Sequence, residues 1–207
     1  MEDFINRLRK TRVLPVIEID DAVSAAPLVK ALSDGGMTAI EIALRTPAAV
    51  DAILAAKRAR PDVLVGAGTV VDGERARRAI AGGADFLVTP GSTRELLVEL
   101  AGFNKPLLPG VATPSEAIAA RALGLKLMKF FPAEPAGGAA YVGALAAPLP
   151  DVLFCPTGGI GVEEAPNYLR LKNVICVGGS WVAPRAAIAA KDWRAIAANA
   201  RRAAALA

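Results

Sequence analysis

The chain of 207 residues has a mass of 21.3 kDa, which allows one large domain or two small ones. Its apolar fraction of 54% and its mean hydropathy of +0.40 exclude an intrinsically disordered protein. The sequence contains no His, which excludes Ser-His-Asp hydrolases, Cys-His proteases, HExxH zinc enzymes and histidine general bases. Any acid–base chemistry therefore has to use carboxylates, lysine, tyrosine or water.

The charge of the chain is modestly basic and spread along its length. The net charge is +4 and the isoelectric point is about 9.3, but no run of five basic residues occurs, so we expect no nucleic-acid partner. Cys155 and Cys176 are too few and too far apart in sequence for a disulfide framework, and we expect buried free thiols in a reducing cytoplasm. The N-terminus lacks the apolar core of a secretory signal, and residues 135–150, the longest uncharged stretch, contain three Pro and three Gly, so we expect no membrane association.

Eight short apolar runs recur along the chain. Most are nearly continuous in Val, Ile and Leu rather than alternating, which is typical of parallel strands that are buried on both faces. The runs are residues 13–19, 39–44, 63–69, 86–91, 106–113, 126–133, 152–159 and 174–180.

Alanine-rich segments with helical spacing lie between these runs. In the first of them, Ala25, Leu28, Val29 and Leu32 share one helix face. Three hydroxyl-containing segments predict helix starts, and three glycine positions predict helix ends. The starts are Thr46-Pro47, Ser92 to Glu95 and Thr113 to Glu116, and the ends are Gly35-Gly36, Gly82-Gly83 and Gly124.

Eight β-α units in 207 residues average about 26 residues each, which predicts an α/β fold of the compact (β/α)8 TIM barrel type. The sequence has no linker or shift of composition, so we expect one domain that covers residues 1–207. An open doubly wound sheet is the competing architecture. We favour the barrel because candidate functional residues follow nearly all of the strands, whereas an open sheet concentrates them at one switch point.

The run at 39–44, continued into Arg45, places Glu41 and Arg45 on the same face as two small residues, Ala39 and Ala43. In a barrel this face points inward, and a charged pair there is costly to desolvate, which typically marks a functional site. A purely structural ion pair between Glu41 and Arg45 is the alternative interpretation.

Lys129 lies in the middle of an apolar run and is flanked by Met128, Phe130 and Phe131. Burial lowers a lysine pKa because it disfavours the charged form, and a neutral amine attacks carbonyl groups to form a Schiff base. Since the chain lacks His, Lys129 is the best candidate nucleophile. The alternative is that its ammonium group reaches solvent from a strand edge.

Glycine pairs end the last two runs, at Gly158-Gly159 and Gly178-Gly179, the second of them before Ser180. Such pairs let backbone N–H groups approach a ligand closely, and the loops after strands 7 and 8 of barrels commonly hold a phosphate group. We therefore predict a phosphate site there, with tight turns as the alternative.

Six motifs in this order resemble the KDPG (2-dehydro-3-deoxy-6-phosphogluconate) aldolase family over essentially the whole chain. They are E-x-x-L-R-T (41–46), V-G-A-G-T-V (65–70), T-P-G (89–91), K-F-F-P-A-E (129–134), F-C-P-T-G-G-I (154–160) and V-G-G-S-W (177–181). The fourth and fifth motifs are the most specific of these.

The resemblance implies a metal-independent class I aldolase without a cofactor, on a (β/α)8 barrel that usually forms a homotrimer. It places Lys129 on the Schiff-base lysine and Glu41 on the general acid/base. The remaining positions are implied to bind substrate: Arg45 and Thr69 the pyruvate carboxylate, Pro90 and Phe131 the pyruvate pocket, Thr157 the sugar hydroxyls, and Gly158, Gly159, Gly179 and Ser180 the phosphate.

The implied reaction cleaves a phosphorylated 2-keto acid, 2-dehydro-3-deoxy-6-phosphogluconate, to pyruvate and glyceraldehyde 3-phosphate. An aldolase for 4-hydroxy-2-oxoglutarate, or for the galactonate epimer, is an alternative with the same chemistry. A non-catalytic phosphosugar-binding protein is a third possibility, which the presence of both Lys129 and Glu41 disfavours.

Overall fold

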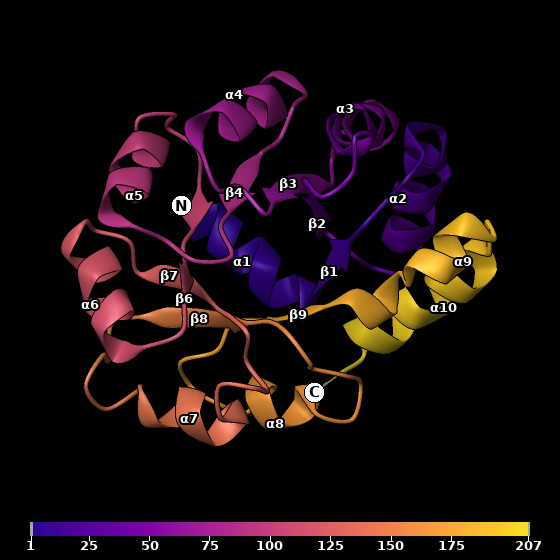
Figure 1. Cartoon of the computed structure of the whole chain (residues 1–207). Helices are drawn as coiled ribbons and strands as arrows, with labels where there is room; N and C mark the ends of the chain where they lie inside the picture. Colours follow the sequence, from indigo (N-terminus) through magenta and orange to yellow (C-terminus); the bar gives the residue numbers. More distant parts are fainter. Residues whose placement is uncertain (1, 207) are drawn as a thin grey trace.

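The computed structural model describes residues 2–206 and has nine parallel β segments, each covered by helices on its outer side (Figure 1). The strands are β1 (Val13–Ile17), β2 (Ala39–Ala43), β3 (Leu64–Gly68), β4 (Phe86–Val88), β5 (Leu107–Leu108), β6 (Gly110–Val111), β7 (Leu127–Phe130), β8 (Leu153–Pro156) and β9 (Val177–Gly179). The helices are α1 (Glu2–Thr11), α2 (Ala25–Asp34), α3 (Ala49–Ala59), α4 (Gly73–Ala81), α5 (Arg94–Ala101), α6 (Pro114–Ala122), α7 (Gly138–Ala144), α8 (Ala165–Leu169), α9 (Arg185–Ala189) and α10 (Trp193–Ala204), with 3-10 turns η1 (Ala22–Ser24) and η2 (Ser180–Val182).

The strands form two parallel sheets. One contains six strands in the order β5-β4-β3-β2-β1-β9, and the other contains β6-β7-β8. From β1 to β5 the neighbours follow chain order, which differs from the order reversal of a doubly wound sheet. The predicted run 106–113 holds both β5 and β6, which are separated by the single residue Pro109. At the other end, isolated parallel bridges pair Phe154 with Val174 and Thr157 with Gly178.

The predicted alternation of strand faces is confirmed by the core, which consists of two clusters of buried side chains. Ile40 and Ile42 of β2 and Met128 of β7 lie in the large cluster between the strands and the outer helices. Ala39 of β2 and Leu127 of β7 lie in the smaller cluster inside the strands. The opposite faces of each strand thus serve two different compartments, as period-2 geometry requires.

The helix boundaries confirm some of the predicted signals and correct others. Thr113 caps α6 in a complete capping box with Glu116, and α2 and α4 end at the predicted glycines. The start at Ser92 is wrong by one residue, because Thr93 caps α5 while Ser92 bonds to Thr89. The start at Thr46 is also wrong. Its hydroxyl donates to the carbonyl of Ile19, and α3 begins only at Ala49.

Helix α1 closes the end of the structure at which the strands begin, and the apolar-run analysis did not predict it. Phe4 and Leu8 are buried in the inner cluster, where the ring of Phe4 packs 5.0 Å from that of Phe86. Arg7 donates to the carbonyl of Thr38, immediately before β2. Within residues 2–206, no helix is long and apolar enough to cross a membrane.

The two cysteines are buried free thiols, as expected from the sequence, and they also contact each other although they are 21 positions apart. Cys155 on β8 and Cys176 immediately before β9 point into the inner cluster, and their sulfur atoms lie 3.4 Å apart. The hydrogen bond to Cys155 raises the pKa of the Cys176 thiol well above its usual value, and burial and the nearby charge of Glu41 act in the same direction.

Replacing Leu8 by Ala should lower the free energy of unfolding by about 2–5 kcal/mol, because a cavity remains where α1 fills the inner cluster. Urea denaturation measures this change. The matched control is Ile118→Ala on the exposed side of α6, which should change stability by no more than about 0.5 kcal/mol. Equal effects of the two variants would show that α1 does not contribute to the core.

Cys176 should react very slowly with iodoacetamide at about pH 8 in the folded protein, because the raised pKa keeps it a neutral thiol and burial blocks the reagent. In urea the same residue should label as fast as a free cysteine. Mass spectrometry of the Cys176 peptide over time compares the two conditions. Rapid labelling of the folded protein would contradict the packing described above.

Candidate active site

Lys129 of β7 and Glu41 of β2 face each other across the interior of the strands. Only 4% of Lys129 and 1% of Glu41 is exposed, and Lys129 Nζ donates to Glu41 Oε1 at 3.1 Å. The two strands belong to different sheets, so this ion pair spans the space between the sheets. Lys129 therefore does not reach solvent from an edge, and the alternative ion pair between Glu41 and Arg45 is wrong.

Small residues provide the room that this buried pair occupies. Gly66 and Gly68 of β3 lie opposite Glu41 and Ala43 of β2. A Cβ atom on Gly68 would meet the Glu41 carboxylate, and one on Gly66 would meet the ring of Phe86. The motif at 65–70 is therefore glycine-rich because side chains from neighbouring strands already fill that volume.

A cavity of about 430 Å³ opens above Lys129 at the carboxyl ends of the strands. It brings together seven of the predicted site residues. Phe131 lies beside Lys129, with its ring centre 5.4 Å from Nζ, which is within cation–π distance. The predicted residues that line the cavity are Arg45, Lys129, Phe131, Thr157, Gly158, Gly159 and Ser180.

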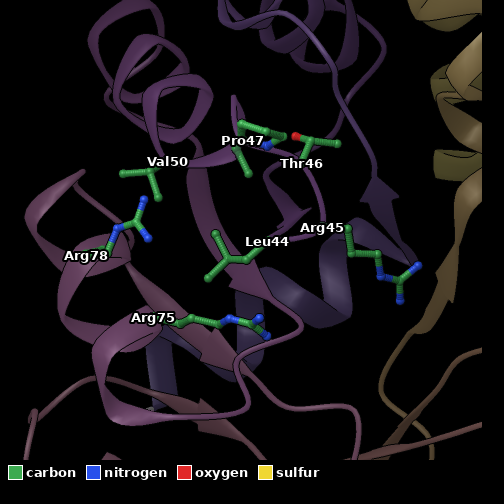
Figure 2. Close-up of a pocket in the computed structure, with 8 residues that line it drawn as sticks. Leu44, Arg45, Thr46, Pro47, Val50, Arg75 and Arg78 are labelled. Atoms are coloured by element: carbon green, nitrogen blue, oxygen red, sulfur yellow. The ribbon is translucent and has the colours of Figure 1, made fainter.

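Arg45 and Thr69 meet at the edge of this cavity. Arg45 Nε donates to Thr69 Oγ1 at 3.0 Å, and Thr69 has φ of 58° at the end of β3. A β-branched residue in this left-handed region is strained by about 1–3 kcal/mol, and such strain is typical of functional positions. Figure 2 shows a neighbouring cavity between α3 and α4, in which Arg45 extends away from Arg75 and Arg78.

The remaining predicted residues lie next to the cavity without lining it. Glu41 accepts a hydrogen bond from Lys129, which lines the cavity, and Thr69 accepts one from Arg45, which also lines it. Pro90 packs with its backbone against Gly110, the residue opposite Lys129 in the sheet. Gly179 lies opposite Pro15 of β1.

The two glycine loops pack against each other at one side of the cavity. Gly158 and Gly159 have φ of 104° and 81°, conformations that favour glycine. A Cβ atom on Gly159 would lie 2.7 Å from that of Glu134, and one on Gly178 would meet the Thr157 side chain. The first loop thus depends on glycine for its backbone conformation, and both loops depend on glycine for close approach.

Several residues that the sequence analysis did not single out also surround the site. A second cavity of about 590 Å³ shares four residues with the first, namely Val16, Arg45, Ser180 and Trp181. It adds Glu18 and Arg185, which form an ion pair with each other. Glu18 carries a signal that was available in the sequence, because it is a charged residue at the end of an apolar strand run.

Comparison with known proteins gives consistent matches over nearly all of the chain. The model of the family described as KDPG and KHG aldolase matches residues 4–199. The chain is 45% identical to 2-dehydro-3-deoxy-phosphogluconate aldolase of Pseudomonas aeruginosa, over 89% of this chain and 84% of that protein. It is 44% identical to KHG/KDPG aldolase of Escherichia coli, over 92% of this chain and 90% of that protein.

A solved structure adds chemical detail about a relative. The KDPG aldolase of Legionella pneumophila, with pyruvate captured as a covalent carbinolamine intermediate, superimposes with a TM-score of 0.92 and is 41% identical. The match covers 95% of this chain and 96% of that one. From the family match, the identities and the shared structure, we conclude that the chain belongs to the KDPG and KHG aldolase family.

Proposed function

We propose that the chain is a class I aldolase that cleaves 2-dehydro-3-deoxy-6-phosphogluconate to pyruvate and glyceraldehyde 3-phosphate. The observation that carries the proposal is the buried contact of 3.1 Å between Lys129 and Glu41 at the base of a cavity that Arg45 also lines. A lysine in this position can attack a carbonyl, and the carboxylate beside it can exchange protons with the bound molecule. The names of the relatives, which specify this substrate, support the choice.

The reaction begins with attack of the Lys129 amine on the C2 ketone, after Glu41 accepts its proton. Glu41 returns that proton to the hydroxyl group of the carbinolamine, and loss of water gives a protonated imine, which accepts electrons from the bond that is broken later. Glu41 then removes the proton of the C4 hydroxyl, the C3–C4 bond breaks, and glyceraldehyde 3-phosphate leaves. Glu41 protonates the resulting enamine at C3, and hydrolysis of the imine releases pyruvate and regenerates the lysine.

The other site residues hold the substrate so that its ketone faces Lys129. Arg45, oriented by Thr69, is placed to bind the carboxylate, and Phe131 bounds the space for the pyruvate portion. We assign Pro90 a supporting role in this pocket, through its backbone contact with Gly110 opposite Lys129. At the far side of the cavity we assign the hydroxyl groups to Thr157. The phosphate is assigned to the loops that contain Gly158, Gly159, Gly179 and Ser180.

Cleavage of 4-hydroxy-2-oxoglutarate is the second candidate. It uses the same two residues, and the name of the Escherichia coli relative includes both substrates. The smaller product would then carry no phosphate and would leave the glycine loops without a ligand. These loops favour the phosphorylated substrate, and the galactonate epimer would use them equally. A non-catalytic phosphosugar-binding role gives no reason for the Lys129–Glu41 pair.

For the architecture, we propose that the two sheets close into one (β/α)8 barrel and that the chain is a single domain. Two observations support closure: only Pro109 separates β5 from β6, and the bridges near Phe154 and Thr157 join β8 to the segment that includes β9. The homotrimer and the cytoplasmic location stay predictions. Sedimentation of the purified protein measures the first of these.

Sodium borohydride added together with pyruvate should inactivate the enzyme irreversibly, because it reduces the imine to a stable secondary amine. Peptide mass mapping should place the adduct on Lys129. The Lys129→Arg variant keeps the positive charge but cannot form the imine productively, so it should neither trap pyruvate nor turn over substrate.

The matched control is Lys126→Arg in the same run of sequence. Lys126 is exposed and pairs with Asp151 far from the cavity, so this variant should trap pyruvate as the wild type does. An adduct on Lys126 would overturn the assignment of the nucleophile. Failure of the wild type to form any adduct would exclude the Schiff-base mechanism.

Glu41→Gln should separate imine formation from proton transfer. Glutamine nearly preserves the shape but cannot accept or return a proton, so exchange of the pyruvate methyl protons with deuterated water should slow about 10²–10⁴-fold. NMR measures this exchange. Borohydride should still trap pyruvate on Lys129, although more slowly. Exchange at the wild-type rate would remove Glu41 from the acid/base role.

A further inference from the structure

Four charged side chains lie together where β1, β2 and β9 end. Glu18 and Asp20 follow β1, Arg45 follows β2, and Arg185 begins α9. Glu18, Arg45 and Arg185 line the cavity of about 590 Å³ that adjoins the catalytic cavity along Arg45. The charges of the two acids and the two arginines balance, although the adjoining catalytic cavity is proposed to receive an anionic substrate.

Arg185 uses all three nitrogen atoms of its guanidinium on the two acids. Its Nε and Nη2 atoms donate to the two carboxylate oxygens of Asp20 at 2.7 and 2.6 Å, which is a bidentate arrangement. Its Nη1 atom donates to Glu18 Oε1 at 2.5 Å. Asp20 thus anchors Arg185, and Arg185 in turn fixes the carboxylate of Glu18.

The Glu18 carboxylate interacts much more weakly with Arg45 than with Arg185. The distance between Arg45 Nη1 and Glu18 Oε2 is 3.8 Å, whereas a charge-assisted hydrogen bond measures about 2.7–2.9 Å. Glu18 is therefore about 1 Å short of a hydrogen bond with Arg45. The side chains are 30% and 44% exposed, so solvent does not prevent a small rotation that would close the gap.

We propose that Arg185 is a positioning residue that holds the Glu18 carboxylate away from Arg45, so that Arg45 stays open to the carboxylate of the substrate. The inference rests on the proposed function, because it takes Arg45 as the carboxylate-binding residue. Glu18 presents the same chemical group as the pyruvate portion of the substrate. Once released from Arg185, it competes with the substrate for the same guanidinium.

The test is Arg185→Met, which preserves much of the aliphatic length and removes the guanidinium. The KM for pyruvate in the methyl-proton exchange reaction should rise about two- to fivefold, because an exposed ion pair with Glu18 then occupies Arg45. The rate at saturating pyruvate should not change, since Lys129 and Glu41 are untouched. Arg121→Met on α6 is the matched control, because it breaks a similarly exposed bond to Asp151 and should leave KM unaltered.

Glu18→Gln provides the decisive second variant, since it removes the competing charge. The KM of this variant should be no higher than that of the wild type. The double variant Glu18→Gln/Arg185→Met should return to the KM of Glu18→Gln alone. A purely structural role for Arg185 would give no such rescue, because the loss of its contacts remains.

Three results would overturn the inference: an unchanged KM in Arg185→Met, an increased KM in Glu18→Gln, or additive effects in the double variant. These outcomes differ from failure of the proposed function. If the proposed function is wrong, the wild type itself neither exchanges pyruvate protons nor forms the borohydride adduct. If only the inference is wrong, both of these wild-type properties remain.

Discussion

The buried ion pair between Lys129 and Glu41 is the interaction on which the rest of the site depends. Removing two charges from water is costly, and the mutual attraction offsets that cost only when the geometry is good and the surroundings leave room. The structure meets this requirement by bringing the two charges from separate sheets and by surrounding them with small residues. Gly68 is the clearest example, since a side chain there would displace the carboxylate of Glu41.

The same constraint explains why the strands have two different faces. The outer face is free to carry branched side chains that pack against the helices, as Ile40 and Ile42 do. The inner face has to hold the ion pair near one end and a filled core near the other, where Phe4 and Leu8 of α1 enter. Catalytic chemistry and stability are thereby assigned to opposite ends of the same strands, a division that is typical of parallel barrels.

Sequence reasoning succeeded where the signal is local. Alternation along β2 and β7 identified the inner faces, and Thr113 with Glu116 identified a helix start, because both patterns depend on neighbouring residues. It failed where a distant partner decides the outcome. Thr46 has the composition of a helix cap, yet its hydroxyl bonds to the carbonyl of Ile19, and the helix begins three residues later.

Long-range pairs were equally inaccessible from sequence. Glu18 and Arg185 are 167 positions apart, and nothing in the local pattern of either residue indicates the other. Cys155 and Cys176 are closer in sequence, but their contact depends on the register between β8 and the start of β9. Candidate site residues could be predicted from their positions on or directly after the strands and from the six motifs, whereas the contact between Glu18 and Arg185 could be found only in the folded structure.

The position of α1 has a consequence for the order of events in a reaction cycle. Because Phe4 and Leu8 fill the interior at the end where the strands begin, the catalytic cavity is a blind-ended chamber with its opening at the other end. Two products formed in such a chamber have to leave through the same opening. In the proposed mechanism, the product held covalently at Lys129, at the base, leaves after the product that lies nearer the loops of β8 and β9. The covalent bond sets this order, with the aldehyde before the keto acid, and the single opening lies on the side from which the aldehyde leaves.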